Sequence, residues 1–261
     1  VLDAGKNRHN MDTLSEIHLN HKTITFKEMV GTGKKEINFS EVELQKAMEY
    51  AAEDADITYR LYKIFNKNLK TEKLTNIYEI FEKPLIEILA LMEIEGIRID
   101  SKFLKNLSEK FERKIKNLEK QIFKISKKEF NIGSPKQLGE IIYNDLKIAG
   151  LKKTRKGSFA TSASVLEDLV FKGNQFPQLI LDWRQVSKLK NTYSDSLPEH
   201  INPKTKRVHT SFLLAATTTG RLASSDPNLQ NIPIKSEDGK DIRKAFVAKN
   251  GFTLVSADYN Q

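Results

Sequence analysis

The sequence predicts an α+β fold that is mostly α-helical. Apolar residues recur every three or four positions over much of the chain, helix-capping patterns precede several of these stretches, and β-branched and aromatic runs typical of strands gather after Pro198. The 261 residues are 39% hydrophobic, which is enough for one or two cores. Length alone allows about two domains.

Helices are expected over most of the first 95 residues. One covers 12–19, opened by Asp-Thr, and a longer one begins at the capping-box pattern Ser-Glu-Val-Glu at 40–43 and runs at least to Leu61. A third covers about 78–95, and the glycine that follows ends it before a short extended segment. The stretch 66–75 is the expected domain boundary.

The most regular pattern in the chain begins at Ser101 and predicts one long helix. Lysine and glutamate fill most positions outside its apolar stripe, so we expect a solvated charged face there rather than a DNA site. The stripe is expected to pack on another helix of the same chain. Its residues are Leu104, Leu107, Phe111, Ile115, Leu118, Ile122 and Ile125.

Shorter elements are expected after this helix. Ser-Pro at 134–135 and Thr-Ser at 161–162 are typical of helix starts, and a further helix covers about 177–197. A basic loop is expected at 152–157 between the first two of these helices. The β-branched and aromatic residues of 208–216 then predict a strand.

Charge and composition limit the classes of function. The formal charge of +9 favours polyanionic partners, nucleic acid first among them, although many basic proteins bind no DNA. The absence of cysteine excludes disulfides and thiolate metal sites. No apolar run approaches the roughly 20 residues of a membrane span, and no signal peptide is evident, so we expect a cytoplasmic protein without a membrane partner. Because the sequence does not begin with methionine, we expect a fragment of a longer protein.

The first motif with possible chemistry is Tyr50-Ala-Ala-Glu-Asp54, inside an expected helix. Four residues make about one helical turn, so the phenol and the carboxylate share a face about 6 Å apart. A metal ion bound by Asp54 would then lie beside a tyrosine able to orient a water. From these five residues alone, an ordinary helix with a half-buried tyrosine is the favoured interpretation.

The second motif is the amide- and hydroxyl-rich stretch 217–233. Asn and Gln side chains offer a donor and an acceptor together, and Arg221 offers a planar fork, which suits the minor-groove acceptors that all base pairs share. A polar surface loop explains the same residues equally well.

The third motif is the segment 253–258, which predicts a strand ending at Asp258. A carboxylate at a strand end is a hard oxygen ligand suited to Mg²⁺. One aspartate is weak evidence, since capping and turn aspartates are more common.

Taken in order, these segments resemble the family A DNA polymerases of bacteria over essentially all 261 residues. The motif 50–56 resembles the third motif of their proofreading 3′→5′ exonuclease. Segments 202–210, 219–222 and 226–233 resemble the passage from thumb to palm, and 255–259 is similar to the start of the first catalytic palm motif.

The resemblance implies a role for each matching residue. Asp54 would be an exonuclease metal ligand with Tyr50 as its water-orienting partner, and Asp258 would be one of the two polymerase metal-binding carboxylates. The implied DNA-binding residues are Arg184, Lys188, Arg221, Gln230, Asn231 and Lys235.

The resemblance also implies a domain order, a cofactor and partners. Residues 1–70 would be the C-terminal part of a ribonuclease H-like exonuclease domain, 71–200 a helical linker and long-helix thumb, and 201–261 the beginning of an antiparallel palm sheet. The parent would be a monomer of the bacterial cytoplasm, associated with the nucleoid, that binds primer-template DNA and deoxynucleoside triphosphates. Two Mg²⁺ ions per complete site would carry out phosphoryl transfer.

Some positions depart from the family pattern. Lys206 stands where a turn glycine is usual, Lys235 where arginine is usual, and Asn260 where serine is usual. Neither metal site has all its ligands within these residues, so the isolated chain is expected to be inactive. The alternative is a non-catalytic DNA-binding or helical scaffold protein derived from a polymerase, which would have no use for the tyrosine and both aspartates.

Overall fold

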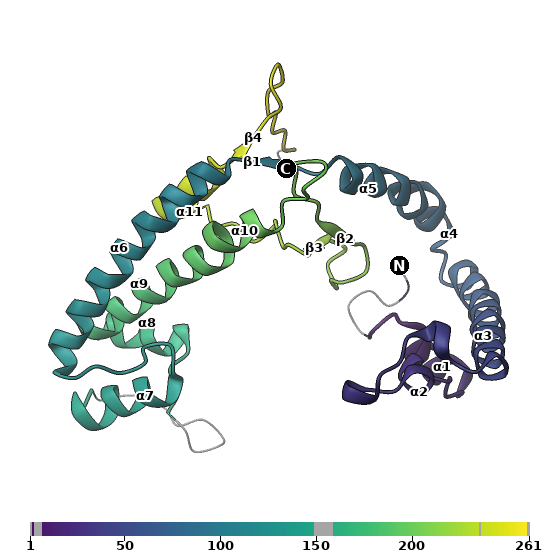
Figure 1. Ribbon diagram of the computed structural model, residues 1–261, viewed down its shortest axis with the longest axis horizontal. Helices are drawn as coiled ribbons and strands as arrows, with labels where there is room; N and C mark the ends of the chain where they lie inside the picture. Colours follow the sequence, from purple (N-terminus) through teal and green to yellow (C-terminus); the bar gives the residue numbers. More distant parts are fainter. Residues whose placement is uncertain (1, 3–6, 149–158, 235, 260–261) are drawn as a thin grey trace. The chain divides into compact units, whose positions relative to one another are not determined.

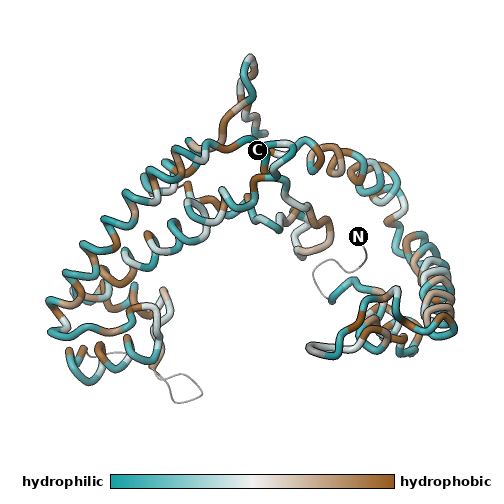
Figure 2. The backbone as a smooth tube through the Cα atoms, in the orientation of Figure 1, coloured by the Kyte–Doolittle hydropathy of each residue, from teal (hydrophilic) through white to brown (hydrophobic). Residues whose placement is uncertain are grey.

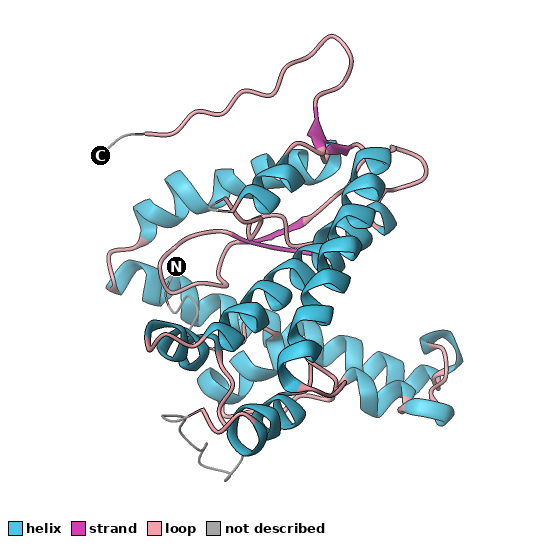
Figure 3. Ribbon diagram, turned by 90° about the vertical axis from the view of Figure 1, so that its left-hand side faces the viewer, coloured by secondary structure: helices cyan, strands magenta, loops and turns pink. Residues whose placement is uncertain are grey.

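The computed structural model describes residues 2, 7–148, 159–234 and 236–259. Among these residues helices predominate and two small antiparallel sheets accompany them, which confirms the predicted α+β, mostly α class (Figure 3). The chain forms two compact units: unit 1 contains residues 1–94 and 211–225, and unit 2 contains 95–210 and 226–261. The predicted division at 70 and 200 stays a prediction. Among the described residues, no helix has the length and apolarity needed to cross a membrane.

Unit 1 is built around one long helix, α3, which is labelled with its neighbours in Figure 1. Short helices precede α3, and an interrupted helix follows it. The hairpin β2–β3 pairs Phe212 with Ser224, and Glu93 Oε1 accepts a hydrogen bond of 2.6 Å from the Phe212 amide. The elements are α1 (Met11–Leu19), α2 (Phe26–Val30), η1 (Gly33–Lys35), η2 (Phe39–Glu41), α3 (Leu44–Thr71), α4 (Thr75–Ile77), the π-helical turn η3 (Tyr78–Glu82), α5 (Lys83–Glu95), β2 (Ser211–Leu213) and β3 (Ala223–Ser225).

The predicted helix starts in unit 1 are displaced by a few residues. Asn10 is the N-cap of α1, so Asp12 and Thr13 lie inside the helix. The capping box forms between Asn38 and Glu41 and opens η2, whereas α3 begins at Leu44. The reason is local: the Asn38 side chain already satisfies the Ser40 amide, at 3.0 Å.

Hydrophobic residues recur along α5, as the colouring of the tube in Figure 2 shows. Within the described chain Leu89 is buried, whereas Ile86, Leu91 and Ile94 are 57%, 60% and 73% exposed. A helix with apolar residues on all sides is typical of an element covered from several directions.

Unit 2 contains the predicted long helix, α6, and the helices that pack on it. The apolar stripe forms the core as expected: every member is buried except Ile125, and α6 packs against α9 and η5. The elements are β1 (Arg98–Ile99), α6 (Ser101–Ser126), α7 (Pro135–Glu140), the π-helical turn η4 (Ile141–Asp145), α8 (Ala163–Phe171), α9 (Gln175–Leu189), the π-helical turn η5 (Lys190–Asp195), α10 (Ser196–Glu199), α11 (Glu237–Arg243) and β4 (Phe246–Val247).

Most predicted helix positions in unit 2 are confirmed. Ser134 caps α7 by accepting from the Gln137 amide, and α8 begins after Ser162. The helix expected over 177–197 runs from 175 to 199 as α9, η5 and α10. The basic loop at 152–157 lies outside the described residues.

The strand predictions were less accurate, because a strand needs a partner outside its own sequence. Only Ser211–Leu213 of the segment 208–216 forms a strand, although Val208 makes isolated bridges. The predicted strand at 253–258 is wrong: this segment has no regular structure and lies exposed, as Figure 3 shows. No described residue pairs with it, so its backbone groups lack the ladder that defines a strand.

Candidate functional sites

The tyrosine and aspartate of the first motif lie together on α3, as their spacing predicts. Tyr50 is half-buried, and its ring contacts Phe26 and Phe39 with centroid distances of 6.4 and 6.0 Å. Burial, followed by the negative charge of Asp54 and a hydrogen bond to it, raises the pKa of Tyr50. The phenol therefore stays protonated beside the carboxylate at neutral pH.

Asp54 has one oxygen available for a ligand. Its Oδ1 is buried and has no hydrogen-bond partner among the described residues. A buried carboxylate oxygen normally needs a partner, and a cation is a partner that fits this chemistry. The described residues contain no group of three His, Cys, Asp or Glu side chains that could hold a metal ion.

The neighbouring residue Glu53 holds the segment before α2 against α3, which the sequence analysis missed. Its carboxylate accepts from the Ile24 amide at 2.6 Å and lies 2.7 Å from His21 Nε2. The Ile24 bond, and then the interaction with His21, hold the pKa of Glu53 below its ordinary value against the opposing effect of burial. No motif signalled this role, because its partners are about 30 residues away in sequence.

Unit 2 carries an open groove of about 810 Å³ beside α9. Arg184 and Lys188 line it from α9, and Pro233, Ile234 and Ser236 line it from the loop before α11. Lys188 is exposed. The groove thus has a cationic wall, although Glu167 and Asp182 also line it.

Arg184 is held more firmly than an ordinary surface arginine. Its Nη1 donates a 2.6 Å hydrogen bond to the Thr161 carbonyl, and burial lowers its pKa. An arginine remains charged at neutral pH despite such a shift. Arg184 therefore joins α9 to the start of α8 and still contributes positive charge to the groove.

The loop 228–233 presents two amide side chains to solvent. Gln230 and Asn231 are both exposed, whereas the next residue, Ile232, is buried in the core formed with α6. The Asn231 carbonyl accepts a 2.5 Å hydrogen bond from Tyr193 Oη of η5. Lys235, the next predicted DNA-binding residue, lies outside the described residues.

Arg221 lies in unit 1, in the connection between β2 and β3. Its side chain is exposed, and its carbonyl accepts a 2.8 Å hydrogen bond from Thr217 Oγ1. Because Gln230 and Asn231 belong to unit 2, a duplex surface shared by all three residues stays a prediction.

Asp258 lies on the exposed segment after β4. Val255 and Tyr259 on the same segment are 87% and 100% exposed. The sequence predicted a strand ending at this carboxylate, whereas the structure places it on a segment that pairs with no other described residue.

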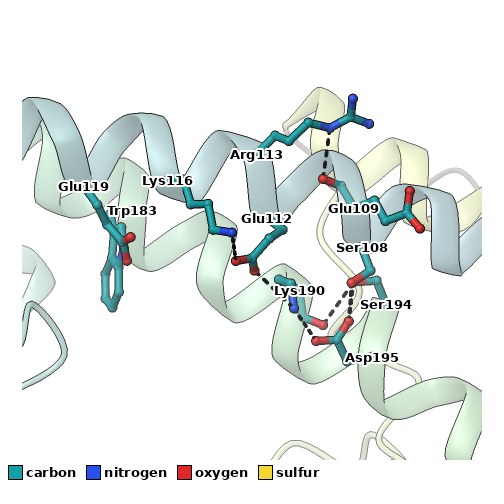
Figure 4. Close-up of polar contacts among 10 residues, drawn as sticks. All are labelled: Ser108, Glu109, Glu112, Arg113, Lys116, Glu119, Trp183, Lys190, Ser194 and Asp195. Atoms are coloured by element: carbon teal, nitrogen blue, oxygen red, sulfur yellow. Dashed lines mark hydrogen bonds and ion pairs between the residues drawn. The ribbon is translucent and has the colours of Figure 1, made fainter.

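A polar network, drawn in Figure 4, joins α6 to α9 and η5. Lys190 Nζ lies 2.7 Å from Asp195 and 3.5 Å from Glu112, and Ser108 Oγ donates to Asp195 at 2.5 Å. Burial would raise the pKa of Asp195, but the bonds from Lys190 and Ser108 hold it below its ordinary value. This network ties η5, which directly follows the helix that carries Arg184 and Lys188, to α6.

Comparison with known proteins defines the class first. Residues 101–261 match DNA polymerase family A, and residues 1–70 match a 3′-5′ exonuclease family. The chain belongs to DNA polymerase family A.

Two relatives named DNA polymerase I are similar to the chain over its full length. The chain is 49% identical to DNA polymerase I of Rhizobium leguminosarum and 44% identical to DNA polymerase I of Pseudomonas aeruginosa, in each case over its whole length. It spans 26% and 29% of those two proteins. Among solved structures, it is similar to the POL domain of Pol1 from M. smegmatis in complex with DNA primer-template and dNTP, with a TM-score of 0.76, 30% identity, and coverage of 97% of this chain and 40% of that one.

Proposed function

We propose that this chain is the part of a bacterial DNA polymerase I that joins its proofreading exonuclease to its polymerase. The parent adds deoxynucleotides to a primer 3′ end under the direction of a template, in replication and repair. It acts as a monomer in the cytoplasm, associated with the nucleoid. Residues 1–70 belong to the exonuclease domain, 71–200 to the linker and thumb, and 201–261 to the palm.

The observation that carries this proposal is the groove in unit 2. Arg184 and Lys188 supply positive charge from α9, and Gln230 and Asn231 extend exposed amides from the loop that leads to its other wall. Cationic side chains position a duplex through its phosphates, and amides contact acceptors common to all base pairs. The similar Pol1 domain was solved with primer-template and dNTP, which supports the same partners here.

We assign the metal ligands to the two aspartates. The unpartnered Oδ1 of Asp54 fits a cation in the exonuclease, with Tyr50 beside it to orient a water. Asp258 would be one of the polymerase carboxylates, with Arg221 at the primer terminus. Magnesium, two ions per site, would stabilise charge on the attacking and leaving oxygens when bound.

The test is binding of the isolated chain to a primer-template duplex at several salt concentrations. We expect binding that weakens steeply with salt, and no primer extension. Lys188→Ala should reduce the slope of log K against log salt by about one, because one phosphate contact is lost.

Lys120→Ala is the matched control. Lys120 is an exposed lysine on the solvated face of α6, so its removal should leave the slope unchanged. Equal effects of the two substitutions, or binding insensitive to salt, would contradict a DNA site in the groove. Primer extension by the isolated chain would contradict the proposed incompleteness of the polymerase site.

A further inference from the structure

The loop 228–233 is fixed along its backbone although its amide side chains are exposed. Thr210 Oγ1 donates to the Pro227 carbonyl at 2.9 Å, and the Gln230 amide donates to Asn228 Oδ1 at 3.0 Å. Backbone held at several points loses less conformational freedom when its side chains bind a partner. The backbone of the loop is therefore preorganised while its amide side chains stay open to solvent.

Further anchors follow immediately. Arg243 Nη2 donates to the Ile232 carbonyl at 3.3 Å. A Cβ on Gly239 would lie 2.7 Å from the Pro233 carbonyl oxygen, so α11 approaches the loop as closely as a glycine allows. Lys110 pairs with Asp241 at 2.8 Å, which ties α11 to α6. The C-terminal side of the loop is thus fastened to α11 and, through it, to α6.

Tyr193 links the core to this loop. It is 2% exposed, and its ring belongs to the core formed with α6. Its hydroxyl donates to the carbonyl of Asn231, an exposed residue. A side chain needed for packing alone would serve as well without the hydroxyl, since a buried hydroxyl is costly unless it is bonded.

The local backbone explains how Tyr193 reaches this carbonyl. It lies in the π-helical turn η5, where the helix that carries Arg184 and Lys188 departs from regular α geometry. Such turns are often found at functional sites. The same turn contains Lys190 and Asp195, whose ion pair joins it to the network around Ser108.

We propose that Tyr193 is a positioning residue for DNA binding. Its hydroxyl fixes the Asn231 carbonyl, and through it the amides of Gln230 and Asn231, relative to the cationic wall on α9. This inference rests on the proposed function, in which those amides contact the duplex. Tyr193 itself touches no DNA, so it acts only through the two amides.

The experiment is a double-mutant cycle on the whole 261-residue chain, with a primer-template duplex of arbitrary sequence as the probe. Tyr193→Phe keeps the ring and should weaken binding about three- to tenfold, with an unchanged salt slope because no phosphate contact is lost. In a background carrying Gln230→Ala and Asn231→Ala, the same substitution should have no further effect on affinity. A merely structural role would weaken binding in both backgrounds.

Tyr143→Phe is the matched control. The Tyr143 hydroxyl is buried without a hydrogen-bond partner in the described chain, so its removal should leave DNA affinity unchanged. Circular dichroism establishes that each variant is folded before binding is measured. Tyr193→Phe with native affinity, or with equal loss in both backgrounds, overturns the positioning role while leaving the proposed function intact. If the unmodified chain binds no duplex, the proposed function fails and this inference fails with it.

Discussion

The two aspartates assigned to metal binding lie in contrasting surroundings. Asp54 is on α3, a 28-residue helix, where its neighbours four residues away are set by the helix itself. Asp258 is on an exposed segment with no regular structure. A helix satisfies its backbone hydrogen bonds within its own sequence, whereas a strand depends on a partner elsewhere.

The two aspartates show which parts of a site a short stretch of sequence can position by itself. The pair of Tyr50 and Asp54 is formed because the residues are one turn apart. The segment that carries Phe252, Leu254 and Asp258 pairs with no strand among the described residues, and Phe252 is 70% exposed. The segment itself therefore does not set the surroundings of its carboxylate, whereas α3 does so for Asp54.

The largest effect is expected in the full-length enzyme, where the two aspartates should separate its two activities. Asp258→Ala should reduce DNA synthesis at least about a thousandfold while exonuclease activity remains, because several kcal/mol of charge stabilisation is lost at one site only. Asp54→Ala should do the reverse. Primer extension and 3′-end degradation assays on the same preparations measure both. Loss of both activities in either folded variant would show that the assigned roles are wrong.

A second, smaller effect concerns the stability of unit 2. Phe111 of α6 is fully buried, and Phe111→Ala should lower the free energy of unfolding by about 3–5 kcal/mol because it leaves a cavity in the core. Val255→Ala, on the exposed segment, should change it by less than about 0.5 kcal/mol. Urea unfolding followed by circular dichroism compares the two. If Val255→Ala lowered the free energy of unfolding as much as Phe111→Ala, the segment would be packed like α6 and not exposed.

The accuracy of sequence-based prediction follows the same division. The stripe from Leu104 to Ile122 predicted α6 and its buried face, since helical periodicity is written within one segment. The cap predicted before α3 was displaced, because the capping box forms between Asn38 and Glu41 and opens η2 instead. The short strands and α11 depend on contacts distant in sequence, such as Arg98 with Val247, and no local pattern encodes them.

The candidate sites divide in the same way. The spacing of Tyr50 and Asp54 was sufficient to place them together. Within the amide-rich segment 217–233, Arg221, Gln230 and Asn231 are exposed, as either a polar loop or a duplex-binding surface requires. The anchors Glu53 and Tyr193 were missed. Their partners, Ile24 and Asn231, are 29 and 38 residues away, and only the folded chain brings them together.

The smallest expected effect tests whether Asp54 interacts with Tyr50. Asp258, by contrast, lies on an exposed segment of the described chain with no neighbouring tyrosine one helical turn away. The pKa of Tyr50 lies above its ordinary value of 10.0, first because of burial and then because of the charge and hydrogen bond of Asp54. Asp54→Asn removes the charge, so ionisation of the phenol becomes easier and the pKa should fall. It should remain above 10.0, because burial is unchanged.

Carbon-13 NMR of labelled tyrosine ring carbons resolves this titration among the seven tyrosines, and Tyr50→Phe assigns the signal. Asp56→Asn is the matched control on the same helix. Asp56 pairs with Arg60 at 3.0 Å on an exposed face, so its neutralisation should leave the pKa of Tyr50 unchanged. If Asp54→Asn left that pKa unchanged as well, burial and the charge of Asp12 would account for it. The Asp54 carboxylate would then have no measurable effect on the tyrosine one turn away, and the spacing of the motif would not couple the two groups.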